Sequence, residues 1–204
     1  GQNVFMLTSF NPGSGKSFLA MNIAMSFAIK KKRILVIDGD LRHGSTSSYV
    51  DSPKTGLSDY LGNRVSDWKE IIVKDEKYDN LHIIPIGTVP PNPTELLEDG
   101  KLATLIEVLR SEYDYIFIDC PPIDIVADAQ IIEKLADRTV FVVRSGLLDR
   151  SMLPELENIY QEKRFKNLSV ILNGTESAGG RYGYRYGYRN GYSSYYGNKG
   201  KMGG

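Results

Sequence analysis

The stretch "VFMLTSFNPGSGKSFLAMNIAMSFAIKK", from Val4 to Lys31, decides the fold of this chain. Its apolar opening, Val4–Ser9, has the composition of a buried strand. A loop rich in glycine and small polar residues follows. Ser17–Lys31 then carries apolar side chains at helical spacing and ends in lysines, which suit the negative end of a helix dipole. A buried strand that leads through a tight loop into a helix is the opening unit of a parallel α/β sheet.

The loop between this strand and this helix has the features of a phosphate-binding loop. It ends in Gly15-Lys16-Ser17 at the start of the helix, as a P-loop does, although the strict pattern has glycine at the position of Phe10. Gly13 and Gly15 leave room for backbone amides around phosphate oxygens, and the helix N-terminus adds positive charge there. Lys16 can reach the β- and γ-phosphates, and the Ser17 hydroxyl can bind Mg²⁺. We expect these residues to contact a nucleotide: Gly13, Ser14, Gly15, Lys16, Ser17 and Phe18.

Beyond this unit, short β-branched runs continue to alternate with helical patterns. Further strands are predicted at Arg33–Asp38, Leu81–Gly87, Tyr115–Asp119, Arg138–Arg144 and Leu168–Asn173. Helices are predicted at Asn92–Tyr113, where Gly100 can interrupt the helix, and near Asp128–Ala136 and Leu153–Lys163. We therefore predict an α/β fold, a doubly wound, mostly parallel sheet of the P-loop NTPase type, over residues 1–173. From 174 to 204 glycine and tyrosine dominate, and we expect a disordered tail.

Three acidic residues follow predicted strands. Asp38 and Asp40 come at the end of one apolar strand, in "ILVIDGDLR", and Asp119 comes at the end of another, in "YIFIDCPP". Ligands of doubly wound sheets bind outside the carboxyl ends of the strands, so the three carboxylates should converge on the phosphates. Mg²⁺ prefers oxygen ligands and keeps several waters. The sequence thus predicts a Mg²⁺–ATP site, with some of its contacts mediated by water.

Composition narrows the classes of function. The 25 basic residues balance 25 acidic ones, so no overall positive field argues for a nucleic-acid partner. Apolar runs are far shorter than the roughly 20 residues of a membrane helix, and Gly1–Phe10 leads into a strand rather than reading as a signal peptide. The single cysteine, Cys120, allows no internal disulfide and fits a reducing cytosol. We expect a soluble protein or the soluble part of one.

The C-terminal segment interleaves tyrosine with glycine and arginine. Its seven tyrosines are Tyr182, Tyr184, Tyr186, Tyr188, Tyr192, Tyr195 and Tyr196. Residues 174–204 carry five basic side chains against one acidic side chain, a net charge of +4, and each phosphotyrosine adds about −1.5 to −2. A stretched tail of this length spans up to about 100 Å. If these tyrosines were phosphorylated at the site of a neighbouring copy, the added charge would reverse the sign of the tail and weaken self-association.

Segments Thr8–Ser17, Ile34–Arg42 and Ile116–Pro122 together resemble the motifs of one family. They look like the Walker A loop, the Asp-x-Asp-x-Arg signature and the Walker B motif of the bacterial tyrosine kinases (BY-kinases) of polysaccharide export. Gly56–Gly62 and Pro90–Leu97 are similar to further family blocks, and the tyrosine cluster is similar to the family's C-terminus. The resemblance runs from about Asn3 to Tyr196.

The resemblance implies a protein-tyrosine kinase that uses ATP and Mg²⁺, autophosphorylates its tyrosine cluster in trans, and regulates capsular and exopolysaccharide synthesis and export. The residues it implies for catalysis are Lys16, Asp38, Asp40 and Asp119, and those for Mg²⁺, directly or through water, are Ser17, Asp38, Asp40 and Asp119. Lys16 would bind the phosphates, and one of Asp38 and Asp40 would act as base on the tyrosine hydroxyl. Arg42 belongs to the motif without an assigned role.

The resemblance also implies partners and a location. The family's partners are neighbouring copies, in some cases as rings, a transmembrane activator segment or adaptor, sugar-nucleotide enzymes and a tyrosine phosphatase. Its Glu-x₂-Arg-x₂-Arg assembly helix precedes the first strand and is not among these residues. We expect a cytoplasmic domain at the inner face of the plasma membrane, held there by a segment or partner outside this chain. For adenine binding we single out Asn173, at a strand end.

Two other functions stay open at this point. Partition- or septum-positioning ATPases of the same superfamily resemble this chain but carry an extra lysine early in the loop, where this chain has Asn11. Arg181, Arg185 and Arg189 among the tyrosines fit RNA binding by stacking and cation–π contacts, although the folded part offers no basic groove. Incubation with ATP separates kinase from ATPase, because only a kinase modifies the tail. RNA binding would fall steeply with salt.

Overall fold

A computed structural model describes residues 2–123 and 127–175. Within them, seven strands form one sheet in the order β3-β4-β2-β5-β1-β6-β7. Their bounds are β1 Val4–Thr8, β2 Ile34–Asp38, β3 Val73–Lys74, β4 Leu81–Ile84, β5 Tyr115–Asp119, β6 Arg138–Arg144 and β7 Ser169–Asn173. Every adjacent pair is parallel except β3 with β4. The predicted α/β fold with a mostly parallel sheet is confirmed. The predicted tail, 174–204, lies outside the described residues except for its first two positions.

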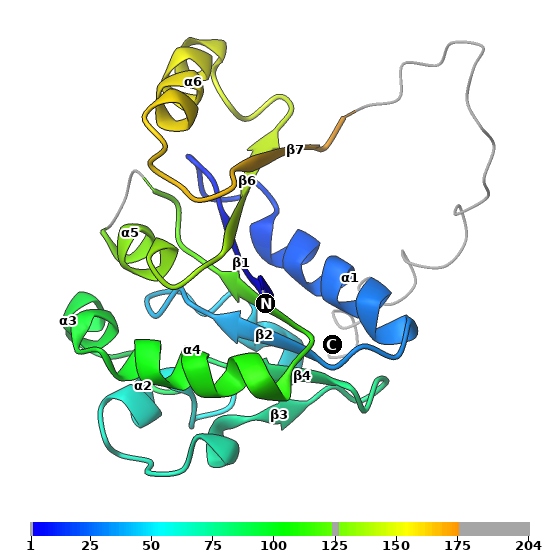
Figure 1. Ribbon diagram of the computed structural model, residues 1–204, viewed down its shortest axis with the longest axis vertical. Helices are drawn as coiled ribbons and strands as arrows, with labels where there is room; N and C mark the ends of the chain where they lie inside the picture. Colours follow the sequence, from blue (N-terminus) through cyan, green and yellow to red (C-terminus); the bar gives the residue numbers. More distant parts are fainter. Residues whose placement is uncertain (1, 124–126, 176–204) are drawn as a thin grey trace, which may run out of the picture.

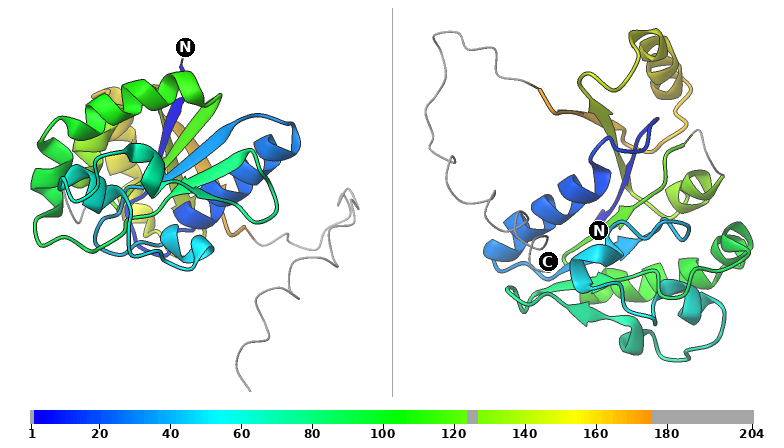
Figure 2. Two further views of the ribbon diagram at one scale, coloured as in Figure 1. Left: turned by 90° about the horizontal axis from the view of Figure 1, so that it is seen from below. Right: turned by 180° about the vertical axis from the view of Figure 1, so that it is seen from behind.

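Helices cover both faces of this sheet. They are α1 Lys16–Ile29, α2 Leu57–Leu61, α3 Pro93–Glu98, α4 Lys101–Glu112, α5 Asp128–Glu133 and α6 Leu153–Gln161, with short 3₁₀ turns η1 Ser47–Val50, η2 Trp68–Ile71 and η3 Arg150–Met152. Figures 1 and 2 show α1 along one face and α3, α4 and α5 along the other. From β1 the chain first builds toward β2 and β4, and later crosses back to β6 on the other side of β1. Ligands of such sheets bind at the carboxyl ends near this reversal.

Two apolar clusters hold the layers together. On one face, strand residues such as Leu7, Val36 and Phe117 pack under the small residues Ala20 and Ala24 of α1. The opposite face carries a larger cluster, in which strand residues meet Leu105, Ile106 and Leu109 of α4. Successive residues of a strand face opposite sides, so strands that are apolar throughout supply both clusters. The strand ends are therefore fixed relative to one another by the core.

Differences from the predicted elements are small and have physical reasons. Six strands were predicted, and the structure adds β3, whose two residues pair antiparallel with Ile83 and His82 and are too few to show a period. The predicted helix at Asn92–Tyr113 is split into α3 and α4 at Gly100, which has a left-handed φ of 80°. The short helix α2 was not predicted. Within the described ranges, no helix has both the length and the apolar character needed to cross a bilayer.

Candidate active site

The loop between β1 and α1 has the backbone of a phosphate cradle. Gly13 and Gly15 adopt left-handed φ values of 74° and 92°, which glycine tolerates best. Helix α1 begins at Lys16, and its first hydrogen bond joins the amide of Leu19 to the carbonyl of Gly15 at 2.9 Å. The amides of residues 16–18 consequently have no acceptor inside the helix. Together with the helix dipole they form a site for an anion.

The structure explains why Phe10 can stand where the strict loop pattern has glycine. Its ring is buried and meets the ring of Phe141 edge-on, with centroids 4.8 Å apart. Hydroxyls of Ser9 and Ser14 both donate to the carbonyl of Asn11, at 2.8 Å each, and close the loop above that anchor. Phe18, by contrast, exposes its ring, so the group it can offer a phosphate is its backbone amide.

Two side chains from neighbouring strands hold the loop from the β6–β7 side. Arg144, the last residue of β6, donates from Nη1 to the carbonyl of Gly13 at 2.7 Å. Asn173, the last residue of β7, donates from Nδ2 to the carbonyl of Ser14 at 3.0 Å. A Cβ on Gly15 would stand 2.3 Å from the same nitrogen. The amide of Asn173, singled out from the sequence for adenine, is thus committed to the loop, and sequence reasoning missed Arg144.

Lys16 and the acids of the two neighbouring strands meet beside this loop. Asp38 and Asp119 occupy matching positions of β2 and β5, and both are buried. Lys16 is buried as well. Burial lowers the pKa of its ammonium group, while the charges of Asp119 and Asp40 raise that pKa. The residues that the strand ends predicted to converge do lie within electrostatic reach of one another.

In each of the two strand-end carboxylates one oxygen is held by a hydrogen bond, and the other has no donor among the described residues. Asp38 Oδ2 accepts from the backbone amide and from the hydroxyl of Ser47, both at 2.7 Å. Asp119 Oδ2 accepts from the hydroxyl of Thr46 at 2.6 Å. The Oδ1 atoms of both acids are buried and find no hydrogen-bond partner in the part of the chain that is described. Sequence reasoning missed Thr46 and Ser47, although the run "GSTSS" after the Asp-x-Asp-x-Arg signature was a visible signal.

Burial changes the proton affinity of both carboxylates. It raises the pKa of Asp38 to about 7, and the charge of the neighbouring Asp119 adds to the shift while the Ser47 hydrogen bonds oppose it. Burial also raises the pKa of Asp119, against the hydroxyls of Ser17 and Thr46. Desolvation disfavours an anion that has too few donors. A cation placed against the free oxygens would reverse both shifts.

Asp40 and Arg42 serve the turn that follows β2. The Asp40 carboxylate accepts from the amides of Arg42 and His43 at 3.2 and 3.3 Å and lies 3.3 Å from the His43 ring nitrogen Nδ1. The Arg42 guanidinium donates to Asp128 Oδ2 of α5 at 3.3 Å and to Thr94 Oγ1 of α3 at 3.1 Å. Arg42 therefore cross-links this turn to the helices α3 and α5.

The residues present fit a magnesium ion that is shared with a nucleotide. In residues 2–123 and 127–175, no three His, Cys, Asp or Glu side chains are grouped as a ready-made metal cage. Mg²⁺ usually takes one or two carboxylates and completes its shell with water and phosphate oxygens. The donor-free oxygens of Asp38 and Asp119 and the hydroxyl of Ser17 are ligands of that kind. Ser17 also lines a cavity of about 260 Å³ with Ser45, Ser48 and Tyr49.

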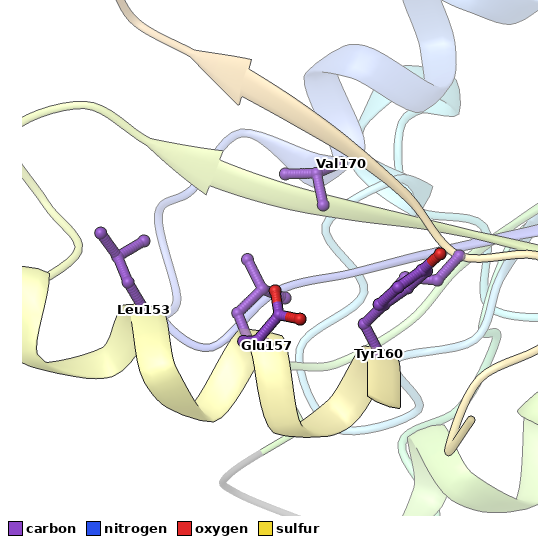
Figure 3. A pocket seen from close by; sticks show the side chains of 6 residues that line it. Leu153, Glu157, Tyr160 and Val170 are labelled. Atoms are coloured by element: carbon purple, nitrogen blue, oxygen red, sulfur yellow. The ribbon is translucent and has the colours of Figure 1, made fainter. Parts of the chain in front are cut away.

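A second cavity lies apart from these residues, between α6 and β7. It measures about 410 Å³ and is lined by Leu153, Leu156, Glu157, Tyr160, Leu168 and Val170. Figure 3 shows Leu153, Glu157 and Tyr160 on successive turns of the helix, with Val170 across from them. The lining is mainly apolar and includes none of the predicted site residues. The size of a cavity is therefore not what identifies the reactive site here.

Sequence comparison relates the chain to proteins named as tyrosine kinases. A domain family described as an AAA domain matches residues 3–169. Tyrosine-protein kinase CpsD of Streptococcus pneumoniae is 35% identical over 200 residues, which make up 97% of this chain and 84% of that protein. The putative tyrosine-protein kinase CapB of Staphylococcus aureus is 34% identical over 82% of this chain and 73% of that protein.

Comparison with solved structures finds a tyrosine kinase domain and, at lower identity, other proteins of the same fold. The kinase domain of Escherichia coli tyrosine kinase ETK has a TM-score of 0.80 at 32% identity and covers 92% of this chain and 72% of its own. The chimerical protein CapA2B2 has a TM-score of 0.77 at 31% identity, with coverages of 84% and 76%. The septum site-determining protein MinD of Pyrococcus horikoshii, complexed with Mg-ADP, has a TM-score of 0.67 at 21% identity, with coverages of 83% and 69%. This last likeness shows a shared fold alone.

Proposed function

Because this chain belongs to the family of bacterial tyrosine-protein kinases, we propose that it transfers the γ-phosphate of ATP to tyrosine hydroxyls. The observation that carries the proposal is the junction of β1, β2 and β5. There a phosphate loop stands next to two buried carboxylates, each with an oxygen that has no donor in the described part of the chain. The family regulates capsular and exopolysaccharide synthesis, and we assign this protein to that process.

The proposed roles follow from what each group can do. Amides of the loop and of the first turn of α1 bind phosphate oxygens, and Lys16 neutralises charge that builds on them in the transition state. Asp38, Asp119 and Ser17 would hold the magnesium ion, which when bound would neutralise charge on the phosphates. Asp40 contributes negative charge nearby and supports the turn. Phosphoryl transfer needs positioning more than covalent help, which a rigid set of strand ends provides.

A carboxylate next to the loop accepts the proton of the tyrosine hydroxyl in this proposal. A general base works best when its pKa lies near the operating pH. Burial raises the pKa of Asp38 to about 7 when no cation is bound, but a magnesium ion on its free oxygen would lower that pKa again. The same oxygen would also be occupied, because it is the only Asp38 oxygen without a donor among the described residues. We therefore propose that one of Asp38 and Asp40 takes the proton, and that Asp40 does so whenever Asp38 holds the metal.

The proposed substrates are the seven tyrosines from Tyr182 to Tyr196. The active site that phosphorylates them belongs to a neighbouring copy of the chain. A stretched segment of 31 residues spans up to about 100 Å, enough to reach another subunit. The segment's net charge of +4 favours approach to an acidic site, and several phosphates reverse its sign. Phosphorylation would then weaken the association that allowed it.

We further propose partners and a location. The protein works at the inner face of the plasma membrane, where a transmembrane activator segment or adaptor outside these residues recruits it. Sugar-nucleotide enzymes of polysaccharide synthesis are proposed as additional substrates, and a tyrosine phosphatase reverses the modification. Co-purification of the chain with membrane vesicles that carry a candidate adaptor tests this location. A chain that stays in the supernatant with every such adaptor would contradict it.

Intact mass after incubation with Mg²⁺ and ATP tests the activity itself. We expect a ladder of up to seven added phosphates on the wild-type chain, no ladder with EDTA, and none for Lys16→Met. Lys30→Met, which changes an exposed lysine just beyond the C-terminal end of the same helix, is the matched control and should keep the ladder. Replacing all seven tail tyrosines by phenylalanine should remove most of the modification and leave ATP binding intact. Release of phosphate with an unmodified tail would instead identify an ATPase.

A further inference from the structure

Two hydroxyl residues of the loop after β2 stand behind the acids of the site. We propose that Thr46 and Ser47 are positioning residues, which fix Asp119 and Asp38 so that one oxygen of each carboxylate is presented to the magnesium ion. The inference rests on the proposed function, because it concerns the metal of the same site. It adds two residues that neither the strand-end pattern nor the P-loop pattern contains.

The two contacts have the same form although they come from different residues. Thr46 donates from Oγ1 to Asp119 Oδ2 at 2.6 Å, and Ser47 donates from Oγ to Asp38 Oδ2 at 2.7 Å. In both acids the other oxygen, Oδ1, is buried without a donor in the described residues. A lone carboxylate has two equivalent oxygens and can rotate about its last bond. Holding one oxygen decides which oxygen remains for a ligand.

The register of β2 against β5 explains why the choice of free oxygen matters for an ion that both acids share. Asp38 and Asp119 are direct neighbours across the β2–β5 pair, so the orientations of their carboxylates decide whether the two free oxygens can serve one ion. Metal ligands are commonly oriented by hydrogen bonds from a second layer of residues. Thr46 and Ser47 are consecutive and buried, so a single short stretch of chain sets both orientations together.

The hydroxyls are themselves held from outside the loop. Ser47 Oγ accepts a hydrogen bond from the amide of Ile86, just beyond β4, at 2.8 Å. That bond uses the acceptor side of the hydroxyl and directs its proton to Asp38. Ser47 also donates its backbone amide to the same Asp38 oxygen at 2.7 Å. Asp38 therefore keeps the Ser47 amide as a donor if the Ser47 hydroxyl is lost. Without the Thr46 hydroxyl, Asp119 keeps only the hydroxyl of Ser17, which is itself a proposed metal ligand.

This difference predicts a graded outcome that a purely structural role would not give. Thr46→Val keeps the shape of the side chain and removes the donor, so it should raise the Mg²⁺ concentration that half-saturates ADP binding by about tenfold or more. Ser47→Ala should raise it by less. ADP affinity measured in EDTA should stay within about twofold of wild type for both, because the loop that binds the phosphates is untouched. Thr46→Ser restores the donor and should return the half-saturation point toward the wild-type value.

Titration of the full chain with a fluorescent ADP analogue, at stepped Mg²⁺ and without phosphoryl transfer, measures this directly. Thr139→Val is the matched control, because Thr139 is also buried, its hydroxyl has no partner within the described residues, and it lies near the start of β6 at the other end of the sheet. It should leave both affinities unchanged. A wild-type Mg²⁺ dependence in Thr46→Val would overturn the proposal, as would equal losses of ADP affinity with and without Mg²⁺. Where Thr46→Val does not fold, Ser47→Ala decides by the same readout.

The outcome separates this inference from the proposed function. A wild-type chain that binds ADP in a Mg²⁺-dependent way but never modifies tyrosine would remove the kinase assignment and leave the positioning role to be measured. A kinase that is fully active while Thr46→Val shows unchanged Mg²⁺ dependence would remove the positioning role alone.

Discussion

Replacing Arg42 by alanine tests whether the arginine of the Asp-x-Asp-x-Arg signature is a cross-link of the fold. Its guanidinium contacts Asp128 Oδ2 at 3.3 Å and Thr94 Oγ1 at 3.1 Å, and Thr94 in turn donates to Asp128 Oδ1 at 2.7 Å. These bonds join the turn after β2 to α5 and α3. The Asp128 side chain is 1% exposed and that of Arg42 is 36% exposed. The substitution therefore leaves a buried carboxylate with a single donor among the described residues.

The size of the effect follows from this unequal burial. Breaking a fully buried ion pair by removing one partner costs about 3–5 kcal/mol, whereas exposed pairs contribute about 0–1 kcal/mol. One partner here is buried and the other is partly in water, so we expect the free energy of unfolding to fall by about 2 kcal/mol. For a domain of this size that corresponds to a loss of about 4–8 °C in Tm.

Thermal and urea unfolding of Arg42→Ala, Asp128→Asn and the double variant form the assay. The double variant should lose less than the sum of the two single variants, by about 1 kcal/mol or more, because the two residues are in contact. Arg33→Ala is the matched control: its ion pair with Asp114 is 3.1 Å long, close to the 3.3 Å of Arg42 with Asp128, but it lies in solvent, with the two side chains 56% and 34% exposed. It should cost less than about 1 kcal/mol. An Arg42→Ala chain with the wild-type Tm and no phosphotyrosine would refute the cross-link and indicate that Arg42 contacts the substrate instead.

Two further outcomes follow from contacts outside that cross-link. Gly15→Ala should weaken ADP binding by about tenfold or more in a fluorescence titration, because alanine is strained at a φ of 92° and its Cβ would displace the Asn173 amide that holds the loop. Asp137→Asn should cost about 2 kcal/mol at pH 7, since this carboxylate accepts the amides of Asn3 and Val4 and the fork of Arg110. Burial alone would raise the Asp137 pKa, but the Arg110 and amide hydrogen bonds lower it overall. The stabilisation is thus present above the unfolded pKa and lost as pH falls through the folded one, so urea titrations should show the two chains converging below about pH 4.

The sequence predicted the fold well where hydrophobic pattern alone decides it. β5 and β6 have the predicted bounds, and β2 begins one residue late, because each is a nearly continuous apolar run that only a covered parallel strand explains. The break at Gly100 was visible because glycine interrupts a helical period. β3 and α2 escaped prediction because two and five residues are too few for a period, and long-range pairing and packing define them.

Residues of the site were likewise predictable where local pattern places them, and not where long-range contacts do. Lys16, Asp38 and Asp119 were predictable because a strand end fixes where a residue lies. What a side chain does there depends on neighbours far away in sequence: Thr46 reaches Asp119 across 73 positions, and Arg144 reaches Gly13 across 131. The local sequence shows only a run of hydroxyl residues around Thr46 and a single basic residue at position 144, and neither indicates which partner the side chain reaches. The acidic residues at strand ends can thus be predicted from the sequence, whereas the residues that orient their side chains cannot.

The loop from Asp40 to Ser47 contains both the cross-linking residue Arg42 and the positioning residues Thr46 and Ser47. Arg42 ties the start of this loop to α3 and α5, and Ser47 ties its end to the amide of Ile86. Thr46 lies between the two anchors and has to hold Asp119 from a loop that is fixed at both sides. Loosening the first anchor should let the Thr46 hydroxyl move. Arg42→Ala should therefore raise the Mg²⁺ half-saturation of ADP binding, by less than Thr46→Val does, while Arg33→Ala leaves it unchanged. An Arg42→Ala chain that is destabilised yet keeps the wild-type Mg²⁺ dependence would show that the second anchor alone orients the acids.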